Sequence, residues 1–354
     1  MGRFFAIARI AAAYAGTVVG AGFASGQELL QFFVSYGTVG IASILLAGLL
    51  FAFLGSQILE LGFRLQATSY HHVLYAVCGR RPGKALDGVT ALFLFGGLCI
   101  MLSSTRAVCH DYFGFDDNTG SLLMALAVAG TVRFGIQGVS TMNLLVIPLL
   151  VGATAVVSVS SLYFHLDEVL SVMAALQPQP QLWPAFHWLP ACLLYVSYNI
   201  MLGATLLAPL GRATPDKTVR LLGGVAGGVL LGALGLMIML VIMLHYPDIA
   251  KYEVPMLYVS NAQHGLNHIG YAVMLLKAMF STAMASLYGC TAKLQSATRL
   301  SFGTCLAVTT IAGLGGSQFG FADLVSFLYP LFGYLSLGFT CALVWQFCRG
   351  RRSR

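Results

Sequence analysis

The chain has 354 residues, of which 58% are hydrophobic and only 9% are charged. Its mean hydropathy of +0.83 lies far above that of soluble domains, so the composition indicates an integral membrane protein and excludes a soluble globular one. The formal net charge of +7 does not indicate a nucleic-acid partner, because the basic residues gather in the loops expected on one side of the bilayer. The eight cysteines show no metal-type spacing.

The first apolar segment contains the stretch GTVVGAGFASGQE, from Gly16 to Glu28. Four glycines fall within eleven of its residues, and each costs about 1 kcal/mol relative to alanine inside a helix. We therefore expect a first half-helix over residues 4–19 and a second one that begins near residues 23–24. A break at mid-membrane depth is tolerated only where it is buried in protein or lines a polar cavity. Broken helices of this kind form the binding sites of many secondary transporters.

An alternative is that these glycines only let neighbouring helices approach closely. Ser25, Gln27 and Glu28 follow them directly, and polar or ionisable residues inside a span are expensive and usually functional. The polar residues favour the broken helix. We also expect the first apolar segment to be retained rather than cleaved as a signal peptide, because Arg9 interrupts its apolar run.

At roughly 20 apolar residues per span, the chain divides into ten spans. With the N-terminus inside, almost every Lys and Arg falls in the short inner loops, which predicts a multi-pass protein of the bacterial inner membrane with both termini in the cytoplasm. A short helix is expected in one inner loop, near residues 71–77. The spans cover residues 4–36, 38–61, 85–109, 119–132, 139–164, 185–210, 221–244, 269–292, 300–315 and 324–347.

A proline-containing linker at residues 167–184 divides this single transmembrane domain, residues 1–354, into two repeats at 4–166 and 185–348. Five spans per half is an odd number, so the second repeat would be inverted relative to the first. An inverted repeat predicts a second broken helix at span six, where Ser197, Asn199 and Gly203 cluster. The expected fold class is thus all-α, with about ten transmembrane helices in a five-plus-five inverted repeat and helices one and six broken.

The stretch GTVVGAGFASGQE and the late stretch GFADLVSFLYPLFGYLSLG, from Gly320 to Gly338, resemble the bacterial YkvI-type membrane proteins over essentially the whole chain. That family is grouped with amino-acid permeases in the amino acid/polyamine/organocation superfamily. The resemblance implies a fold of the leucine-transporter type, with substrate held between the unwound parts of spans one and six. It implies that amides of span one receive a substrate carboxylate, and the substrate-binding residues would be Gly20, Gly22, Phe23, Ala24, Ser25, Ser197, Tyr198 and Asn199.

The same resemblance implies a possible Na⁺ site. Its ligands would be backbone carbonyls of Gly16, Val19 and Ala278 and the hydroxyls of Ser281 and Thr282. Positions three and four residues apart share a helix face, and oxygen ligands suit a hard cation. The serine and threonine could equally hydrogen-bond their own helix.

Three charged residues within spans are candidate coupling or gating groups: Glu28, Arg106 and Lys277. Lys277 lies about 12 Å into span eight and four residues before Ser281, so its ammonium could replace Na⁺ and favour proton coupling. It could also be a buried structural lysine. Glu28 and Arg106 lie at similar depth and could form or flank an outer gate. Glu28 could alternatively accept a substrate amine or a coupling proton.

We find no Walker-type loop, nucleophile elbow or membrane-embedded carboxylate pair, so we do not expect an enzyme, and we expect no cofactor besides Na⁺ or H⁺ as a coupling ion. The leading hypothesis is a secondary active transporter, an ion-coupled symporter that moves a small amino-acid-like solute by alternating access. The alternative is a ligand sensor that has the same scaffold but does not transport. Some spore-germination receptor subunits resemble such a sensor.

Overall fold

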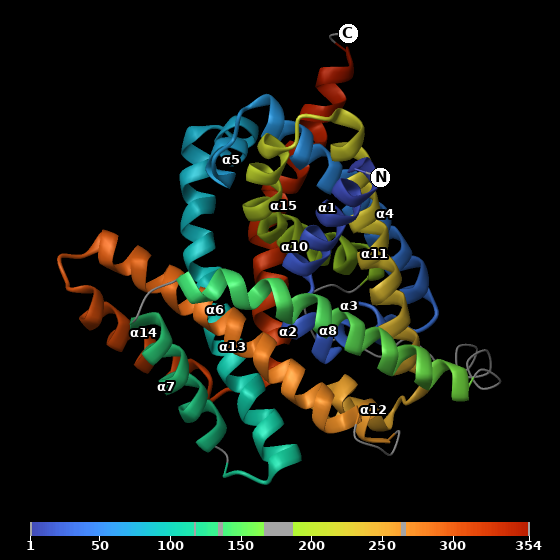
Figure 1. The fold of residues 1–354 in the computed structure, drawn as a ribbon, viewed down its shortest axis with the longest axis vertical. Coiled ribbons are helices and arrows are strands. Elements are labelled where there is room, and N and C mark those ends of the chain that lie inside the picture. The colour runs from blue at the N-terminus through green and yellow to red at the C-terminus, as the bar shows by residue number, and fades with distance from the viewer. Residues whose placement is uncertain (1, 117, 134–136, 166–186, 263–266, 353–354) are drawn as a thin grey trace.

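The computed structural model describes residues 2–116, 118–133, 137–165, 187–262 and 267–352. Within these ranges every regular element is a helix, and the helices pack around one buried apolar core. Both chain ends lie at the same end of the bundle (Figure 1). The elements are α1 (Gly2–Val18), α2 (Ala21–Ser25), α3 (Gln27–Phe32), η1 (Val34–Tyr36), α4 (Val39–Arg64), α5 (Tyr70–Cys78), α6 (Arg80–Phe113), α7 (Thr119–Arg133), α8 (Gln137–Phe164), α10 (Trp188–Ala213), α11 (Lys217–Leu244), η2 (Asp248–Lys251), α12 (Pro255–Ala262), α13 (Asn267–Ala297), α14 (Phe302–Gly316) and α15 (Phe321–Arg352).

Six of these helices are long and apolar enough to cross a membrane, namely α4, α6, α10, α11, α13 and α15. Shorter apolar helices are α7, α14 and the described part of α8. Each falls on a predicted span, and α5 confirms the short helix expected near residues 71–77. The count of ten spans and the bounds of the two repeats stay predictions, and the linker at 167–184 lies outside the described residues.

Helix α1 is anchored in the bundle by Tyr14, whose side chain is fully buried. Its hydroxyl donates a hydrogen bond of 3.0 Å to the carbonyl of Phe51 in α4. Gly55 of α4 and Gly227 of α11 leave room for the ring, because a Cβ at either position would contact it. The first helix is therefore clamped between α4 and α11 through an aromatic side chain that needs two glycines opposite it.

Helices α4 and α11 pack with their backbones in contact. A Cβ added to Gly48 would lie 3.0 Å from the Cα of Gly232, and one added to Gly228 would run into the backbone of Ala52. Small residues at four-residue spacing permit this close approach in membranes, where there is no hydrophobic drive to bring helices together. We call this contact the glycine seam, and its pairs are Gly48 with Gly232, Ala52 with Gly228, and Ser56 with Gly224.

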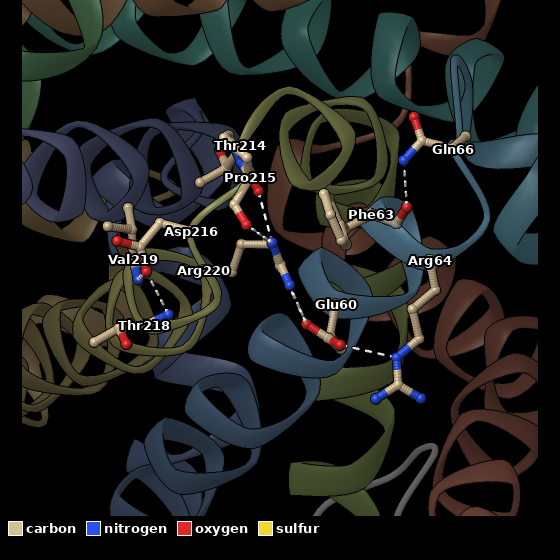
Figure 2. Close-up of polar contacts among 10 residues, drawn as sticks. All are labelled: Glu60, Phe63, Arg64, Gln66, Thr214, Pro215, Asp216, Thr218, Val219 and Arg220. Atoms are coloured by element: carbon tan, nitrogen blue, oxygen red, sulfur yellow. Dashed lines mark hydrogen bonds and ion pairs between the residues drawn. The ribbon is translucent and has the colours of Figure 1, made fainter.

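A charged cluster joins α4 to the loop between α10 and α11 (Figure 2). Arg220 at the start of α11 is only 3% exposed, and its Nη2 lies 2.8 Å from Oε2 of Glu60 in α4. Its Nη1 donates to the carbonyls of Thr214 and Pro215, each at 2.8 Å. The guanidinium also lies 3.8 Å from the ring centroid of Phe63. The buried cation is thus matched by an anion, two carbonyls and an aromatic ring.

The same loop holds the start of the chain. The carboxylate of Asp216 caps α11 by accepting the N–H of Thr218 at 2.9 Å, and it also pairs with Arg3 of α1 at 2.8 Å. The backbone N–H bonds and Arg3 hold the pKa of Asp216 below its ordinary value, although partial desolvation opposes them. The N-terminal end of α1 is therefore tied to the loop by an exposed ion pair, which is a weak tie.

Candidate functional site

The first span is interrupted at two places, and the glycine pattern predicts the first of them, between α1 and α2. Helix α1 ends at Val18, and Gly20 is extended, with φ −90° and ψ −174°, before α2 begins. A second interruption falls at Gly26, whose φ of +83° lies in the left-handed region that favours glycine. The five residues of α2 are all buried, so the broken backbone lies inside the protein. This meets the condition under which an interrupted helix is tolerated at membrane depth.

Glu28, in the first turn of α3, turns its carboxylate back toward this break. The side chain is 5% exposed, and a Cβ added to Gly22 would collide with its Oε1. The hydroxyl of Tyr198 in α10 donates to Oε2 of Glu28 at 2.6 Å. The hydroxyl of Tyr329 in α15 also hydrogen-bonds the carboxylate. The carboxylate therefore joins the break to two helices that are far away in the sequence.

Aromatic rings pack around Tyr198, which donates to this carboxylate. The rings of Tyr198 and Tyr329 stack with centroids 5.0 Å apart and an interplanar angle of 14°. Tyr195, one turn earlier in α10, lies 5.5 Å from Tyr198 and 5.4 Å from Phe32. The Tyr195 side chain is fully buried, and its hydroxyl has no hydrogen-bond partner in the part of the chain that the structure describes. The centroid of Phe93 in α6 lies 6.4 Å from that of Tyr198.

No cationic side chain pairs with Glu28 among the described residues. Its polar partners are the hydroxyls of two tyrosines, both neutral donors. A carboxylate buried without a counter-charge is expensive, because the protein does not repay its lost hydration. The site therefore holds a buried ionisable group whose negative charge no described cation balances.

The predicted substrate residues of span one all lie at the break. Ser25 does not face outward with a free hydroxyl, because its Oγ donates to the carbonyl of Gly22 at 2.7 Å. The carbonyl of Ala24 accepts a 2.6 Å hydrogen bond from the hydroxyl of Tyr271 in α13. Phe23 is 1% exposed, and Gly20 is the extended residue directly before α2.

Span six is not broken, which corrects the prediction from the inverted repeat. Helix α10 runs without interruption from Trp188 to Ala213. The polar residues that suggested a break bond their own helix instead. Ser197 Oγ donates to the carbonyl of Leu193 at 2.6 Å, and Asn199 Nδ2 donates to that of Tyr195 at 3.0 Å. Of the three predicted residues on this span, Tyr198 alone has a side-chain bond to the break.

The structure does not bring Arg106 to Glu28. Arg106 Nη1 donates to the carbonyl of Gln318 at 3.2 Å, and its charge acts on Glu253, in the segment before α12. Burial raises the pKa of Glu253 above its ordinary value, although the Phe321 N–H and Arg106 oppose the shift. No ion pair joins Glu28 and Arg106, so the outer gate expected from their similar depth is not formed by direct pairing.

The side chain of Lys277 is exposed, so Lys277 is not the buried structural lysine that the sequence allowed, and its role in coupling stays a prediction. The buried stripe of α13 follows Tyr271, Leu275 and Ala278, and Lys277 falls at its edge. Of the possible Na⁺ ligands, Ala278 and Ser281 are buried, Thr282 is partly buried, and Gly16 and Val19 lie buried at the end of α1. The hydrogen bond from Tyr271 to the break places α13 beside span one, and the Na⁺ site itself stays a prediction.

Sequence reasoning missed Tyr195, Tyr271 and Tyr329. Tyr329 lies within the late stretch from Gly320 to Gly338, which carried the family resemblance but received no site assignment. Tyrosines in apolar spans resemble ordinary core aromatics. The available signal was the tyrosine hydroxyl, because a buried hydroxyl needs a hydrogen-bond partner.

Solved structures of membrane transporters share this arrangement. Mhp1 in its inward-facing conformation superposes with a TM-score of 0.65 and 14% identity, covering 94% of this chain and 75% of Mhp1. The manganese transporter of Eremococcus coleocola superposes with a TM-score of 0.64 and 15% identity, covering 96% of this chain and 78% of the transporter. MhsT in complex with L-phenylalanine superposes with a TM-score of 0.60 and 17% identity, covering 92% of this chain and 87% of MhsT. The chain has the leucine-transporter type of fold that these transporters share.

Relatives by sequence place the chain more closely. It is 30% identical over 346 residues to the membrane protein YkvI of Bacillus subtilis, with 98% of this chain and 97% of YkvI covered. It is 24% identical over 324 residues to YyaD of the same organism, with 91% of each chain covered. The chain belongs to the YkvI family of membrane proteins. No model of a known protein family matches the chain.

Proposed function

We propose that the protein is a secondary active transporter of a small amino-acid-like solute. It works by alternating access and couples transport to a Na⁺ or H⁺ gradient across the bacterial inner membrane, with both termini in the cytoplasm. One observation carries the proposal: the break in span one is buried and carries a carboxylate, Glu28, that is bonded to Tyr198 of α10. An intramembrane ionisable group at a broken helix is the usual place of substrate and ion binding in such proteins.

The break also supplies a hinge. Around Gly20 the backbone bonds are few: Gly20 N–H reaches the Val18 carbonyl at 2.8 Å, and Ala24 N–H reaches the Gly20 carbonyl at 3.0 Å. Helix α1 can therefore tilt about Gly20 with little loss of hydrogen bonding, while α2 and α3 stay with the tyrosines. Tilting would release the exposed ion pair of Arg3 with Asp216 and the Tyr14 hydroxyl bond to Phe51, and it would open a path to Glu28 from the end of the bundle that holds the termini.

The similarity to transporters supports transport over enzymatic chemistry, and no comparison favours the sensor alternative. The fold alone does not name a substrate, since L-phenylalanine and manganese are named with different relatives of the same architecture. Substrate class must be argued from the site.

The test is uptake into proteoliposomes that hold the purified protein, with a mixture of radiolabelled amino acids outside and an imposed Na⁺ or pH gradient. We expect accumulation of at least one solute above its outside concentration, and collapse of that accumulation when an ionophore dissipates the gradient. Gly22→Ala, which pushes a methyl group into the Glu28 carboxylate, should abolish uptake. Gly130→Ala, on α7 with open space around it, should not. Ligand binding without any flux would overturn the proposal in favour of a sensor.

A further inference from the structure

Glu28 has the properties of one half of an ion pair, and no cationic side chain among the described residues supplies the other half. The carboxylate is 5% exposed, and its described hydrogen-bond donors are the neutral hydroxyls of Tyr198 and Tyr329. Packing alone does not need this charge, since a glutamine would fill nearly the same volume. An expensive group at the centre of the fold therefore points to a positive charge that comes from outside the chain.

The carboxylate also occupies the place where a substrate carboxylate was expected. Its Oε1 lies against Gly22, whose amide belongs to the set predicted to receive an anion. Two like charges about 4 Å apart at an effective dielectric constant of 20 disfavour binding by roughly a thousandfold. A ligand that enters with its anionic end toward Gly22 would meet this repulsion, whereas one that enters with its cationic end would meet attraction of the same size.

The surroundings distinguish an organic cation from a metal ion. The stacked rings of Tyr198 and Tyr329, with Tyr195 and Phe32 beside them, present π-systems and only a few neutral oxygen atoms. Hard metal ions select cages of several oxygen ligands, while ammonium groups bind well to aromatic faces beside a carboxylate. The buried Tyr195 hydroxyl, which has no partner in the described part of the chain, adds an acceptor for an ammonium N–H.

We propose that Glu28, with the aromatic rings of Tyr195, Tyr198 and Tyr329, binds the ammonium group of the substrate. The substrate is then an amine or an amino acid recognised by its cationic end, and a free carboxylic acid is not a ligand. This inference rests on the proposed function, because it names what that same site transports. It differs from the carboxylate-first orientation that the resemblance implied for the amides around Gly22.

The test uses matched triads of compounds and thermal stabilisation of the full-length protein in detergent. Each triad holds an amino acid, the amine formed by removing its carboxyl group, and the acid formed by removing its amino group. Suitable triads are leucine, 3-methylbutylamine and 4-methylpentanoate; phenylalanine, phenethylamine and 3-phenylpropanoate; and alanine, ethylamine and propanoate. We expect the amine and the amino acid of at least one triad to raise the melting temperature, and no acid to do so.

Variants then assign the effect to Glu28. Glu28→Gln should weaken the binding of the amine by about a hundredfold or more, because it keeps the shape and removes the charge. Glu28→Asp, which keeps the charge but withdraws it, should weaken binding less and keep the preference for amine over acid. Glu253→Gln removes a different, half-buried carboxylate and should leave the affinity unchanged. It serves as the matched control.

The outcomes separate this inference from the proposed function. Stabilisation by an acid, unchanged amine affinity in Glu28→Gln, or no shift with any triad overturns the inference. Uptake of a carboxylic acid that lacks an amino group would also overturn the inference, but it would support the transporter proposal. Amine binding that depends on Glu28, without flux in proteoliposomes, would support the inference and overturn the transporter proposal.

Discussion

The cluster around Arg220 allows one stability effect to be worked out from the structure. In the variant Glu60→Ala, the buried guanidinium loses its anion but keeps the two loop carbonyls and the ring of Phe63. Breaking a buried ion pair by removing one partner costs about 3–5 kcal/mol. Because the Glu60 side chain is 22% exposed and part of the cation stays bonded, we expect the lower end, about 3 kcal/mol.

The matched control is Arg64→Ala. Arg64 pairs with the same carboxylate at the same 2.8 Å, but it is 54% exposed and lies one turn away on the same helix. Exposed pairs of this type contribute about 0.3–0.5 kcal/mol. At about 2–4 °C per kcal/mol, Glu60→Ala should lower the melting temperature by roughly 6–12 °C and Arg64→Ala by roughly 1–2 °C.

The assay is thermal unfolding in detergent, followed by intrinsic fluorescence, for both single variants and for a Glu60→Ala, Arg220→Met double variant. Removing both charges should recover part of the loss, since an apolar pair in a buried place is often as stable as an ion pair. Equal shifts for Glu60→Ala and Arg64→Ala would refute the reasoning, as would a double variant less stable than Glu60→Ala by the full cost of losing Arg220.

Three further predictions follow from single positions. Gly228→Ala forces the glycine seam apart and should lower the free energy of unfolding by about 1–3 kcal/mol. Gly130→Ala should leave that free energy unchanged or raise it by up to about 1 kcal/mol. Similar melting temperatures for the two variants would count against the seam. Gly22→Ala should leave the protein folded in size-exclusion chromatography but eliminate the ligand-induced melting shift, and a preserved shift would contradict the crowding at Glu28. Because burial raises the pKa of Glu253, its folded form binds protons more readily than its unfolded form, so stability should fall as pH rises from about 4.3 through the raised pKa. Melting temperatures across that acidic range should decline in the wild type and stay flatter in Glu253→Gln; parallel curves would exclude this role.

Much of the fold follows from simple patterns in the sequence. The long apolar runs predict the spanning helices, and the glycine cluster predicts the break in span one to within about three residues. Positive φ explains the glycine at position 26, since that backbone geometry is one that other residues rarely adopt.

The break expected in span six fails for an equally physical reason. Serine and asparagine inside a span can satisfy themselves on the carbonyl one turn earlier, as Ser197 and Asn199 do, and sequence alone does not distinguish this from an unwound segment. Gly203 likewise serves packing, because it faces the ring of Tyr14. Polar residues and glycines in a helix are thus weaker signals than glycines at several adjacent turns.

The candidate site was predictable on one side only. Glu28 was identifiable as a costly intramembrane charge, but its partners depend on how distant helices fold together. Tyr198 lies 170 residues from Glu28, and only tertiary packing shows that its hydroxyl meets the carboxylate. The estimated membrane depth did not predict the exposure of Lys277 or the contacts of Arg106. Distance along a helix axis does not determine the direction in which a side chain at the edge of a buried stripe points.

The contact between α4 and α11 also sets an order of events during synthesis. Glu60 and Arg220 are 160 residues apart, and at about 5–20 residues per second the ribosome needs roughly 8–32 s to make the chain between them. During that interval α4 has already been made, but its side of the glycine seam has no partner helix. The first half of the chain therefore waits in the membrane incompletely packed, and its final assembly is a late step that follows the emergence of α11.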